Sequence, residues 1–438
     1  MRHIPEKVQI DFTDEKITGS AGGIFLGQVA SRMGLPEMLA RNLSVKVRDR
    51  GASDSEMMLS LIYSLAQGDG ALCDVDRLGA DESRQLLLGL GQVPGSRRLG
   101  EYLSRFGSKS VGCLRGVAQQ AAGGVIGDVA RHLQEQHGYV PVFVDGTAVE
   151  VEGREYEGAF SGYNEEEQYW LHSVFVGPLW VSQVLNPGGE DVAGGWRRQL
   201  EETAYLLKDM AIKVWVRVDN AYYRGEVVSF CRAMGWDYSI SVTNDTYKKP
   251  LWEEVQVLAD SDWEWLSDDR TEQAALICHQ PAGWEEMESY VVVRSFFDGN
   301  QKLLLPRYSF ILVSNHDMPL GEMVKRHRGK MGQENAQKGP LIDLDLHHPP
   351  CRSFHANQAF YTAGQIAQVL LVAVQYKLLP RKARIHGIRM VIRNLVRTAG
   401  RLVRHGRQWT LKFAKSALRL DWLIHAADRL DTSDFSPA

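Results

Sequence analysis

The sequence has little of what marks secreted, membrane-spanning or disulfide-bonded proteins. Its N-terminus has no apolar core of the signal-peptide type, and its longest apolar stretches are interrupted by charges or glycine. No two cysteines form a Cys-x-x-Cys pair, which excludes a disulfide framework and a structural zinc site of the usual spacing. We therefore expect a cytoplasmic protein that does not bind membranes. The five cysteines are Cys73, Cys113, Cys231, Cys278 and Cys351.

Internal repeats are also lacking, since no segment of about 20 to 50 residues recurs along the chain, and this argues against a solenoid. The 438 residues, 44% of them hydrophobic, are enough for two or three domains with sizeable cores.

Negative charge is missing from one long stretch, although the whole chain has a formal net charge of −4. Residues 377–419 contain 13 Lys or Arg and no Asp or Glu. Five of these arginines recur at spacings of four, four, four and three, which predicts one basic face of a helix. Such a face fits a phosphate backbone; the alternatives are a solvated face or another anionic partner. The arginines are Arg389, Arg393, Arg397, Arg401 and Arg404.

The opposite bias is found in residues 251–290, where 11 acidic residues accompany a single arginine, Arg270. We do not expect this acidic segment to lie along DNA. Trp263 and Trp265 within it are interpreted as core residues rather than as stacking platforms for a flipped base.

Two aspartates stand at the ends of apolar runs that are typical of buried strands. Asp145 follows residues 140–144, and Asp219 follows residues 214–218. A buried strand holds the residue at its end rigidly. Open α/β sheets bind their ligands at this edge. Taken alone, an aspartate in such a place is more often a turn or cap residue than a catalytic one.

The motifs around these aspartates occur in an order that resembles the DDE transposases of bacterial insertion sequences, most closely the 1380 group. The resemblance covers most of the chain, and it rests on the order of the motifs rather than on any one of them. The motifs are Leu72–Leu78, Leu99–Phe106, Gly158–Asn164, Leu185–Gly188, Arg217–Tyr223, Gly235–Tyr238, Glu334–Asn335 and Phe354–Ala359.

The resemblance implies a third catalytic acid and nearby basic residues. In the wider superfamily this acid lies in a signature of Tyr, two residues, Arg, three residues and Glu, with a Lys downstream. Here His327, Lys330, Glu334 and Lys338 occupy the corresponding places, so the aromatic and guanidinium identities are changed. Glu334 is the expected third ligand, and the basic residues are expected DNA contacts or solvated charges. Other acids remain as competitors, namely Asp317, Glu322, Asp343 and Asp345.

The coarse secondary structure predicts an RNase H-like mixed α/β sheet flanked by helices. A strand at 140–144 precedes a hairpin at 168–184, a helix at 190–210 and strands at 215–219 and 238–242. We expect a helical N-terminal DNA-binding region (1–138), a catalytic core in two parts (139–247 and 315–376), a β-rich insertion (248–314) and a basic helical C-terminal region (377–438). Residues 358–379 predict a long apolar helix.

The implied chemistry is phosphodiester cleavage and strand transfer with two Mg²⁺ ions, for which Mn²⁺ can substitute. In this interpretation Asp145 binds both ions, and Asp219 and Glu334 bind one each. The expected partners are double-stranded DNA, as terminal inverted repeats and as target, and a second copy of the chain on the paired ends. The bacterial cytoplasm, with association to the nucleoid, is the expected location.

Two other functions fit the same residues. One is a metal-dependent endonuclease of the same fold that does not join strands. The other is a DNA-binding protein derived from a transposase that no longer cuts DNA.

Overall fold

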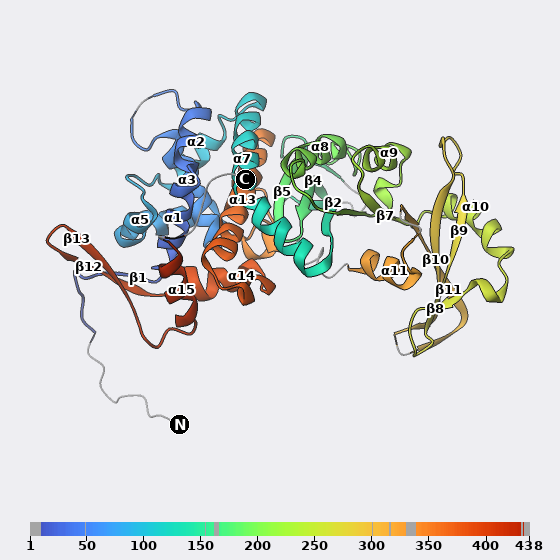
Figure 1. Cartoon of the computed structure of the whole chain (residues 1–438). Helices are drawn as coiled ribbons and strands as arrows, with labels where there is room; N and C mark the ends of the chain where they lie inside the picture. Colours follow the sequence, from blue (N-terminus) through green and yellow to red (C-terminus); the bar gives the residue numbers. More distant parts are fainter. Residues whose placement is uncertain are drawn as a thin grey trace.

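The computed structural model describes residues 10–432 except 49, 154, 162–165, 300, 315–316, 330–338 and 431. The molecule is elongated (Figure 1). A helical body lies at one end, a large sheet runs through the middle, and an antiparallel β-rich part lies at the other end. Within the described residues, no helix combines the length and apolar character needed to cross a membrane.

The N-terminal part is helical after one short strand, β1 (Lys16–Thr18). Its third helix begins with a capping box, in which Ser53 and Glu56 satisfy each other's backbone N–H groups. Its last helix is the longest and packs against the sheet. The helices are α1 (Gly23–Arg32), α2 (Leu35–Asn42), α3 (Asp54–Ala66), α4 (Val75–Ala80), α5 (Glu82–Leu88), α6 (Ser96–Leu103) and α7 (Ser108–His137).

The central sheet confirms the expected RNase H-like arrangement. Its core strands lie in the order β5, β4, β2, β6, β7. The pairs β5–β4 and β4–β2 are antiparallel, and β2–β6 and β6–β7 are parallel. A short strand, β3, also pairs with β4. The bounds are β2 (Val140–Glu150), β3 (Phe160–Ser161), β4 (Glu167–Val176), β5 (Leu179–Asn186), β6 (Val214–Val218) and β7 (Asp237–Val242).

Helices α8 (Trp196–Leu207) and α9 (Gly225–Ala233) pack against this core sheet. The sequence predicted a helix from residue 190, but α8 begins six residues later. Gly195, which precedes α8, has a φ of 87°, a left-handed conformation that glycine adopts easily and that interrupts a right-handed helix. The residues before it form a loop in which Val192 lies against Gly146 on β2.

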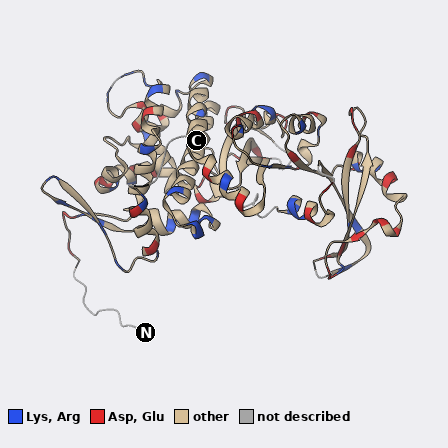
Figure 2. Ribbon diagram, viewed as in Figure 1, with Lys and Arg blue, Asp and Glu red and all other residues tan. Residues whose placement is uncertain are grey.

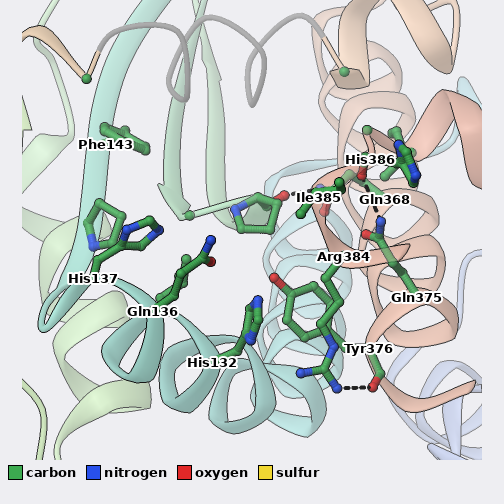
Figure 3. Close-up of a pocket in the computed structure, with 18 of the residues that line it drawn as sticks. His132, Gln136, His137, Phe143, Gln368, Gln375, Tyr376, Arg384, Ile385 and His386 are labelled. Atoms are coloured by element: carbon green, nitrogen blue, oxygen red, sulfur yellow. Dashed lines mark hydrogen bonds between the residues drawn. The ribbon is translucent and has the colours of Figure 1, made fainter. Parts of the chain in front are cut away.

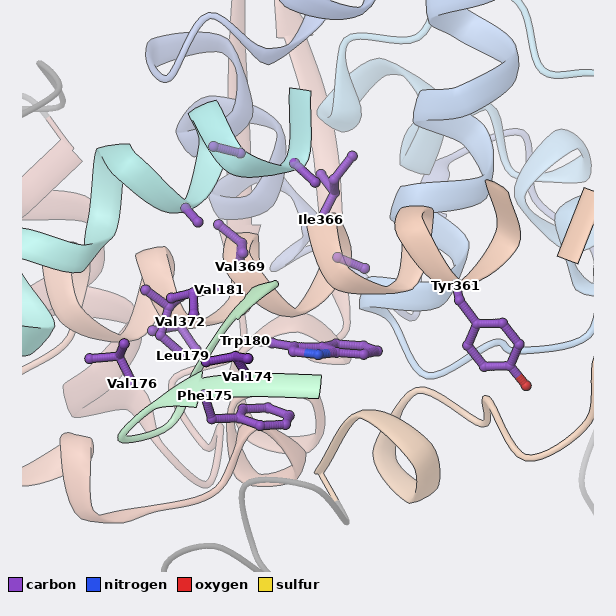
Figure 4. Packing of buried hydrophobic residues seen from close by; sticks show 14 of the residues in the cluster. Val174, Phe175, Val176, Leu179, Trp180, Val181, Tyr361, Ile366, Val369 and Val372 are labelled. Carbon is purple, nitrogen blue, oxygen red and sulfur yellow. The ribbon is translucent and has the colours of Figure 1, made fainter. Parts of the chain in front are cut away.

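The long apolar helix expected near residue 358 is α13 (Phe354–Ala373), which continues as η5 (Val374–Leu378). It lies against β5 and buries valines, aromatic rings and Ile366 between helix and sheet (Figure 4). Phe175 and Trp180 stack with ring centroids 5.7 Å apart. Three glutamine side chains tie β5 to α13: Gln365 donates to the Trp180 carbonyl, Gln368 accepts from the Trp180 N–H, and Gln183 donates to Thr362.

The β-rich insertion continues the same sheet, because β11 pairs with β7 and is followed by β10, β9 and β8. Its three long strands, β9, β10 and β11, are antiparallel to one another. Helix α11 packs beneath them and closes a small separate core with Val291 and Val313. The bounds are α10 (Asp245–Gln256), β8 (Glu264–Trp265), β9 (Glu272–His279), β10 (Glu288–Asp298), β11 (Gln301–Val313) and α11 (Leu320–Arg328).

Acidic residues are frequent on the surface of the insertion, over α10 and beside the strands (Figure 2). Trp263 is buried and lies under the guanidinium of Arg294 at 4.0 Å, as expected for a core residue. Trp265 is 44% exposed, so the same expectation is wrong for this side chain.

The C-terminal region corrects the prediction of one basic helix. The helical stretch α14 (Ile388–Val391) and η7 (Ile392–Val396) ends before Arg397. Arg401 and Arg404 instead lie on β12 (Gly400–His405), which pairs with β13 (Gln408–Phe413) and with β1. A Cβ on Gly400 would lie 2.5 Å from the Cβ of Ala21, so this glycine permits the close approach that starts the strand. Helix α15 (Leu420–Leu430) follows.

Candidate active site

Asp145 and Asp219 lie beside each other just past the point where the parallel pairing of β2 and β6 ends, although β2 itself continues to Glu150. The register of β2 and β6 pairs Phe143 with Arg217, and two residues further along each strand are Asp145 and Asp219. Neighbouring strands are about 4.8 Å apart. The structure therefore brings together the two acids that the sequence predicted, but only Asp219 follows the end of its strand, because Asp145 lies within β2 and pairs with Ser173 on β4.

The carboxylate of Asp219 is fixed by a local turn. Its Oδ1 accepts a hydrogen bond of 2.9 Å from the backbone N–H of Ala221, at the start of the single turn η2 (Asn220–Tyr222). Loss of solvent raises the pKa of Asp219, although the Ala221 N–H and the nearby Arg217 guanidinium oppose this rise. Asp219 is an exposed residue, so its carboxylate is accessible to a cation.

A buried histidine and tyrosine lie behind the two aspartates. The Tyr222 hydroxyl is 3.3 Å from Nδ1 of His172, and both residues are essentially inaccessible to solvent. Burial, and then the carboxylates of Asp145, Asp219 and Asp191, raise the pKa of Tyr222 well above its ordinary value. The three carboxylates therefore lie near one buried, neutral phenol.

Gly146, within β2, allows the chain around His172 and Val192 to pack closely against the strand. A Cβ at this position would lie 2.9 Å from the carbonyl oxygen of Val192 and 3.2 Å from Cε1 of His172. The loop between β5 and α8 can therefore reach the strand only because residue 146 has no side chain.

The same loop carries Asp191, which Arg224 holds with an N–O distance of 2.7 Å. The backbone N–H of Ala193, together with this guanidinium, keeps the pKa of Asp191 below its ordinary value. Asp191 thus stays ionised and adds negative potential close to Asp145 and Asp219.

A cavity of about 800 Å³ adjoins the site. Phe143, which precedes Asp145 on the same face of β2, lines it, and the end of α7 and residues 375–389 form its walls (Figure 3). Three arginines face it, namely Arg326, Arg384 and Arg389. Partial burial lowers the pKa of His132 and His137 in its wall, so the positive charge of this cavity at neutral pH comes from the arginines.

Three expected site residues, Lys330, Glu334 and Lys338, lie outside the described residues. Gly329 and Gly339, which flank that segment in the chain, both line the cavity. Within the described part of the chain, no group of three His, Cys, Asp or Glu side chains is arranged to hold a metal ion. The described part of the site is thus the pair of aspartates.

His327 was expected to contact DNA, but it lies in the interior. It is 6% exposed, and its two ring nitrogens lie 3.0 Å and 2.9 Å from the hydroxyl oxygens of Ser239 and Ser241 on β7. Burial lowers the pKa of His327 to about 3. A neutral ring with both nitrogens engaged has nothing left to offer a phosphate, so its position argues against DNA contact.

Two of the competing acids are engaged by cations. Glu322 accepts from Arg326 one turn later on α11, at 2.9 Å. Asp343 lies 3.8 Å from Nε of Arg389, and burial raises its pKa. Asp317 and Asp345 are also among the described residues, and the latter has a φ of 54°.

The five arginines of the predicted stripe are dispersed. Three have acidic partners: Arg389 with Asp343, Arg397 with Asp69 at 2.6 Å, and Arg401 with Glu15 at 2.6 Å. Arg393 and Arg404 are exposed. These residues therefore serve partly to hold the C-terminal region against the N-terminal one.

Sequence reasoning missed the supporting residues. Tyr222 stands inside the motif Arg217–Tyr223, so its place after Asp219 was a usable signal. Nothing in the sequence distinguishes His172 or Asp191, because their roles depend on strand pairing and on the loop that approaches Gly146.

Comparison with known proteins decides the family. Residues 3–434 match the family model described as Transposase DDE domain group 1. The chain belongs to this transposase family. The DDE transposase domain thus extends over nearly the whole chain, including the helical N-terminal part and the C-terminal hairpin.

A solved structure described as the cryo-EM structure of a piggyBac transposase synaptic complex with hairpin DNA is similar to this DDE transposase domain. The two are 9% identical with a TM-score of 0.44, and the alignment covers 88% of this chain and 82% of that chain. The comparison with curated proteins gives no match.

Proposed function

We propose that this DDE transposase domain is an active DNA transposase that cleaves DNA at transposon ends and joins them to target DNA, by the cut-and-paste route. The observation that carries the proposal is the placement of Asp145 and Asp219 on adjacent parallel strands. Their position in the sheet, together with the family match, supports phosphodiester chemistry at this edge.

The donor chemistry fits a hard divalent cation, Mg²⁺ or in its place Mn²⁺. Asp145 and Asp219 supply two carboxylates, the oxygen ligands that such an ion prefers. Glu334 is proposed as the third ligand, supported by the positions of Gly329 and Gly339 beside the cavity. When bound, two such ions activate the attacking oxygen and stabilise the leaving one.

The protein's own residues hold the reacting groups. Asp145 and Asp219 present their carboxylates on a rigid strand edge, and the Tyr222–His172 pair excludes water behind them. Arg384 and Arg389 are proposed to contact phosphates of a strand that lies in the cavity. Lys330 and Lys338 are proposed as further phosphate contacts. In the reaction, water first frees a 3′ hydroxyl, which then attacks the target strand.

The finer assignment is also a proposal. The motif order favours the 1380 group of bacterial insertion sequences, which act on terminal inverted repeats in the cytoplasm. Two transposon ends must be held together for cut-and-paste transposition, so a homodimer on paired ends is proposed.

The test is cleavage and strand transfer on duplex DNA that carries the ends of its own element, with Mg²⁺. Wild type is compared with Glu334→Gln, which keeps the size of the side chain and removes its charge. Glu253→Gln, an exposed acid on α10, is the matched control. We expect Glu334→Gln to abolish both activities while DNA binding persists, and the control to behave like wild type.

The outcomes separate the alternatives. Cleavage without joining would identify an endonuclease, and an inactive wild type that binds the ends would identify a DNA-binding derivative. Full activity of Glu334→Gln would move the third ligand to another carboxylate.

A further inference from the structure

The β12–β13 hairpin projects from the helical body as a two-stranded ribbon (Figure 1). At its base it is part of a three-stranded sheet, because β1 pairs with β12 from Gly400 to Leu402. Leu402, Leu411 and Phe413 pack there against Ala21, Ile24 and Leu87. The base is thus anchored in the core.

The outer part of the ribbon lacks that support. The pairing of β1 with β12 ends at Leu402, whereas β12 and β13 stay paired as far as His405 and Gln408, with Gly406 in the turn at a φ of 60°. Three residues past Leu402 extend roughly 10 Å at about 3.3 Å each. That reach is close to the depth of the major groove of DNA, about 8.5 Å.

The exposed side chains of the outer ribbon are cationic or hydrogen-bonding. Arg404, His405, Arg407, Gln408 and Lys412 are exposed. The guanidinium of Arg404 lies 5.5 Å from the centre of the Trp409 ring, which is 39% exposed. The whole segment from 377 to 419 has no acidic residue. Asp14 and Glu15 line one shallow hollow together with Arg401, Arg404 and Trp409, and Glu15 forms an ion pair with Arg401.

The width of the ribbon fits only one of the two grooves of duplex DNA. Two paired strands about 4.8 Å apart, with their side chains, are too broad for a minor groove of about 6 Å but fit a major groove of about 12 Å. Arginine and glutamine at the tip are the side chains that read guanine and adenine edges there.

We propose that the β12–β13 ribbon is a DNA-binding arm that enters the major groove of a duplex. Arg404 and Arg407 act at the tip, and Lys412 contacts the flanking backbone. The proposal takes its partner, duplex DNA, from the proposed function, but it concerns a surface separate from the acidic site.

The test uses the full chain with the double substitution Arg404→Gln and Arg407→Gln. Binding to duplex DNA that carries the element's ends is followed by fluorescence anisotropy over a range of NaCl concentrations. We expect the slope of log K against log salt to fall by about 2, since each cation that displaces counterions from the duplex contributes about 0.9. Methylation protection of guanine N7 at the bound site should be lost as well.

The matched control is Lys302→Gln with Arg307→Gln. These two exposed cations lie on another projecting hairpin, β10–β11, within the acidic insertion. The control should leave the slope and the protection unchanged. All four positions are exposed, so both variants should melt within about 2 °C of wild type, because surface changes alter stability little.

Several results would overturn the proposal. If wild type binds and cuts DNA while the ribbon variant matches it in slope and protection, the ribbon is not a DNA arm and the proposed function stands. Unchanged N7 protection with a reduced slope would place the ribbon on phosphates outside the groove. Normal DNA binding with loss of dimers in light scattering would make it a protein contact. A wild type that does not bind duplex DNA would remove both proposals.

Discussion

The two halves of the large sheet differ in how their strands end. In the core, β2 and β6 run parallel, and their register brings Asp145 on β2 beside Asp219 at the end of β6. In the insertion, β9, β10 and β11 alternate in direction. Within the described residues neither half contains a group of three metal-ligating side chains, but the 11 acidic residues of segment 251–290 have no parallel strands to bring two of them side by side. Strand direction, rather than the number of carboxylates, creates a candidate site.

The largest expected effect tests this difference directly. Asp145→Asn should lower Mg²⁺-dependent DNA cleavage by about 10³-fold or more, because a lost metal ligand removes several kcal/mol of transition-state stabilisation. Asp268→Asn, the same change at an exposed position of the insertion, should leave the rate unchanged. Single-turnover cleavage measures both. Comparable losses in the two variants would contradict the contrast.

The pH dependence of stability should come mainly from the core half. Burial lowers the pKa of His172 to about 4 and that of His327 to about 3, against about 6.5 in an unfolded chain. Both rings stay neutral in the folded protein, so their contribution is complete above pH 6.5. It is lost as the pH falls, because only the unfolded chain takes up the protons; at pH 5 the loss is roughly 2 kcal/mol for each histidine.

Urea denaturation at pH 7 and pH 5 measures this loss. His327→Gln should remove roughly half of the difference between the two pH values, whereas His405→Gln on the exposed ribbon should remove none. An unchanged difference in His327→Gln would show that this histidine is not buried in its neutral form.

A smaller effect on stability is expected from Gly146, the glycine that follows Asp145 on β2. Gly146→Ala should destabilise the protein by roughly 1–3 kcal/mol, because its Cβ meets the Val192 carbonyl and overpacks the site. Gly321→Ala, on α11 with open space around it, should be neutral or slightly stabilising. Thermal melting of the two variants makes the comparison, and equal melting temperatures would refute the tight packing at residue 146.

The smallest effect belongs to the surface of the insertion. Arg307 and Asp298 form an ion pair at 2.9 Å, with both side chains more than half exposed. Arg307→Ala should change stability by no more than about 0.5 kcal/mol, since solvent screens such pairs. Denaturant midpoints at low and high salt test this, and a loss above 1 kcal/mol would mean that the hairpin contributes to the fold.

Much of the core could be predicted because its signals are local. Apolar runs followed by Asp145 and Asp219, and the hairpin around Gly177, carry their structure in short windows of sequence. The burial of His327 could not be predicted, because Ser239 and Ser241 lie far earlier in the chain and meet it only after the sheet forms. Glu334 lies outside the described residues, so its place in the site stays a prediction.

In the C-terminal region, two sequence patterns overlap: the spacing of the arginines and the alternation of apolar residues. The arginine spacing of about four matches a helix, but Leu402, Leu411 and Phe413 follow the alternation of strands and pack on α1 and α5. The close contact of Gly400 with Ala21 favours the two-residue period of a strand over the 3.6-residue period of a helix. A contact across so many residues is not visible in either segment alone.

The glutamines that tie α13 to β5 also bear on assembly. A free outer strand of a sheet can recruit a strand from another molecule. Here the backbone of Trp180 is already bonded to side chains of α13, and at the opposite end β8 offers only two residues, Glu264 and Trp265. Two copies brought together on DNA would therefore have little to gain from joining their sheets. Their association would depend on helices, hairpins or the DNA itself, and it could be reversed without unpairing a β-sheet.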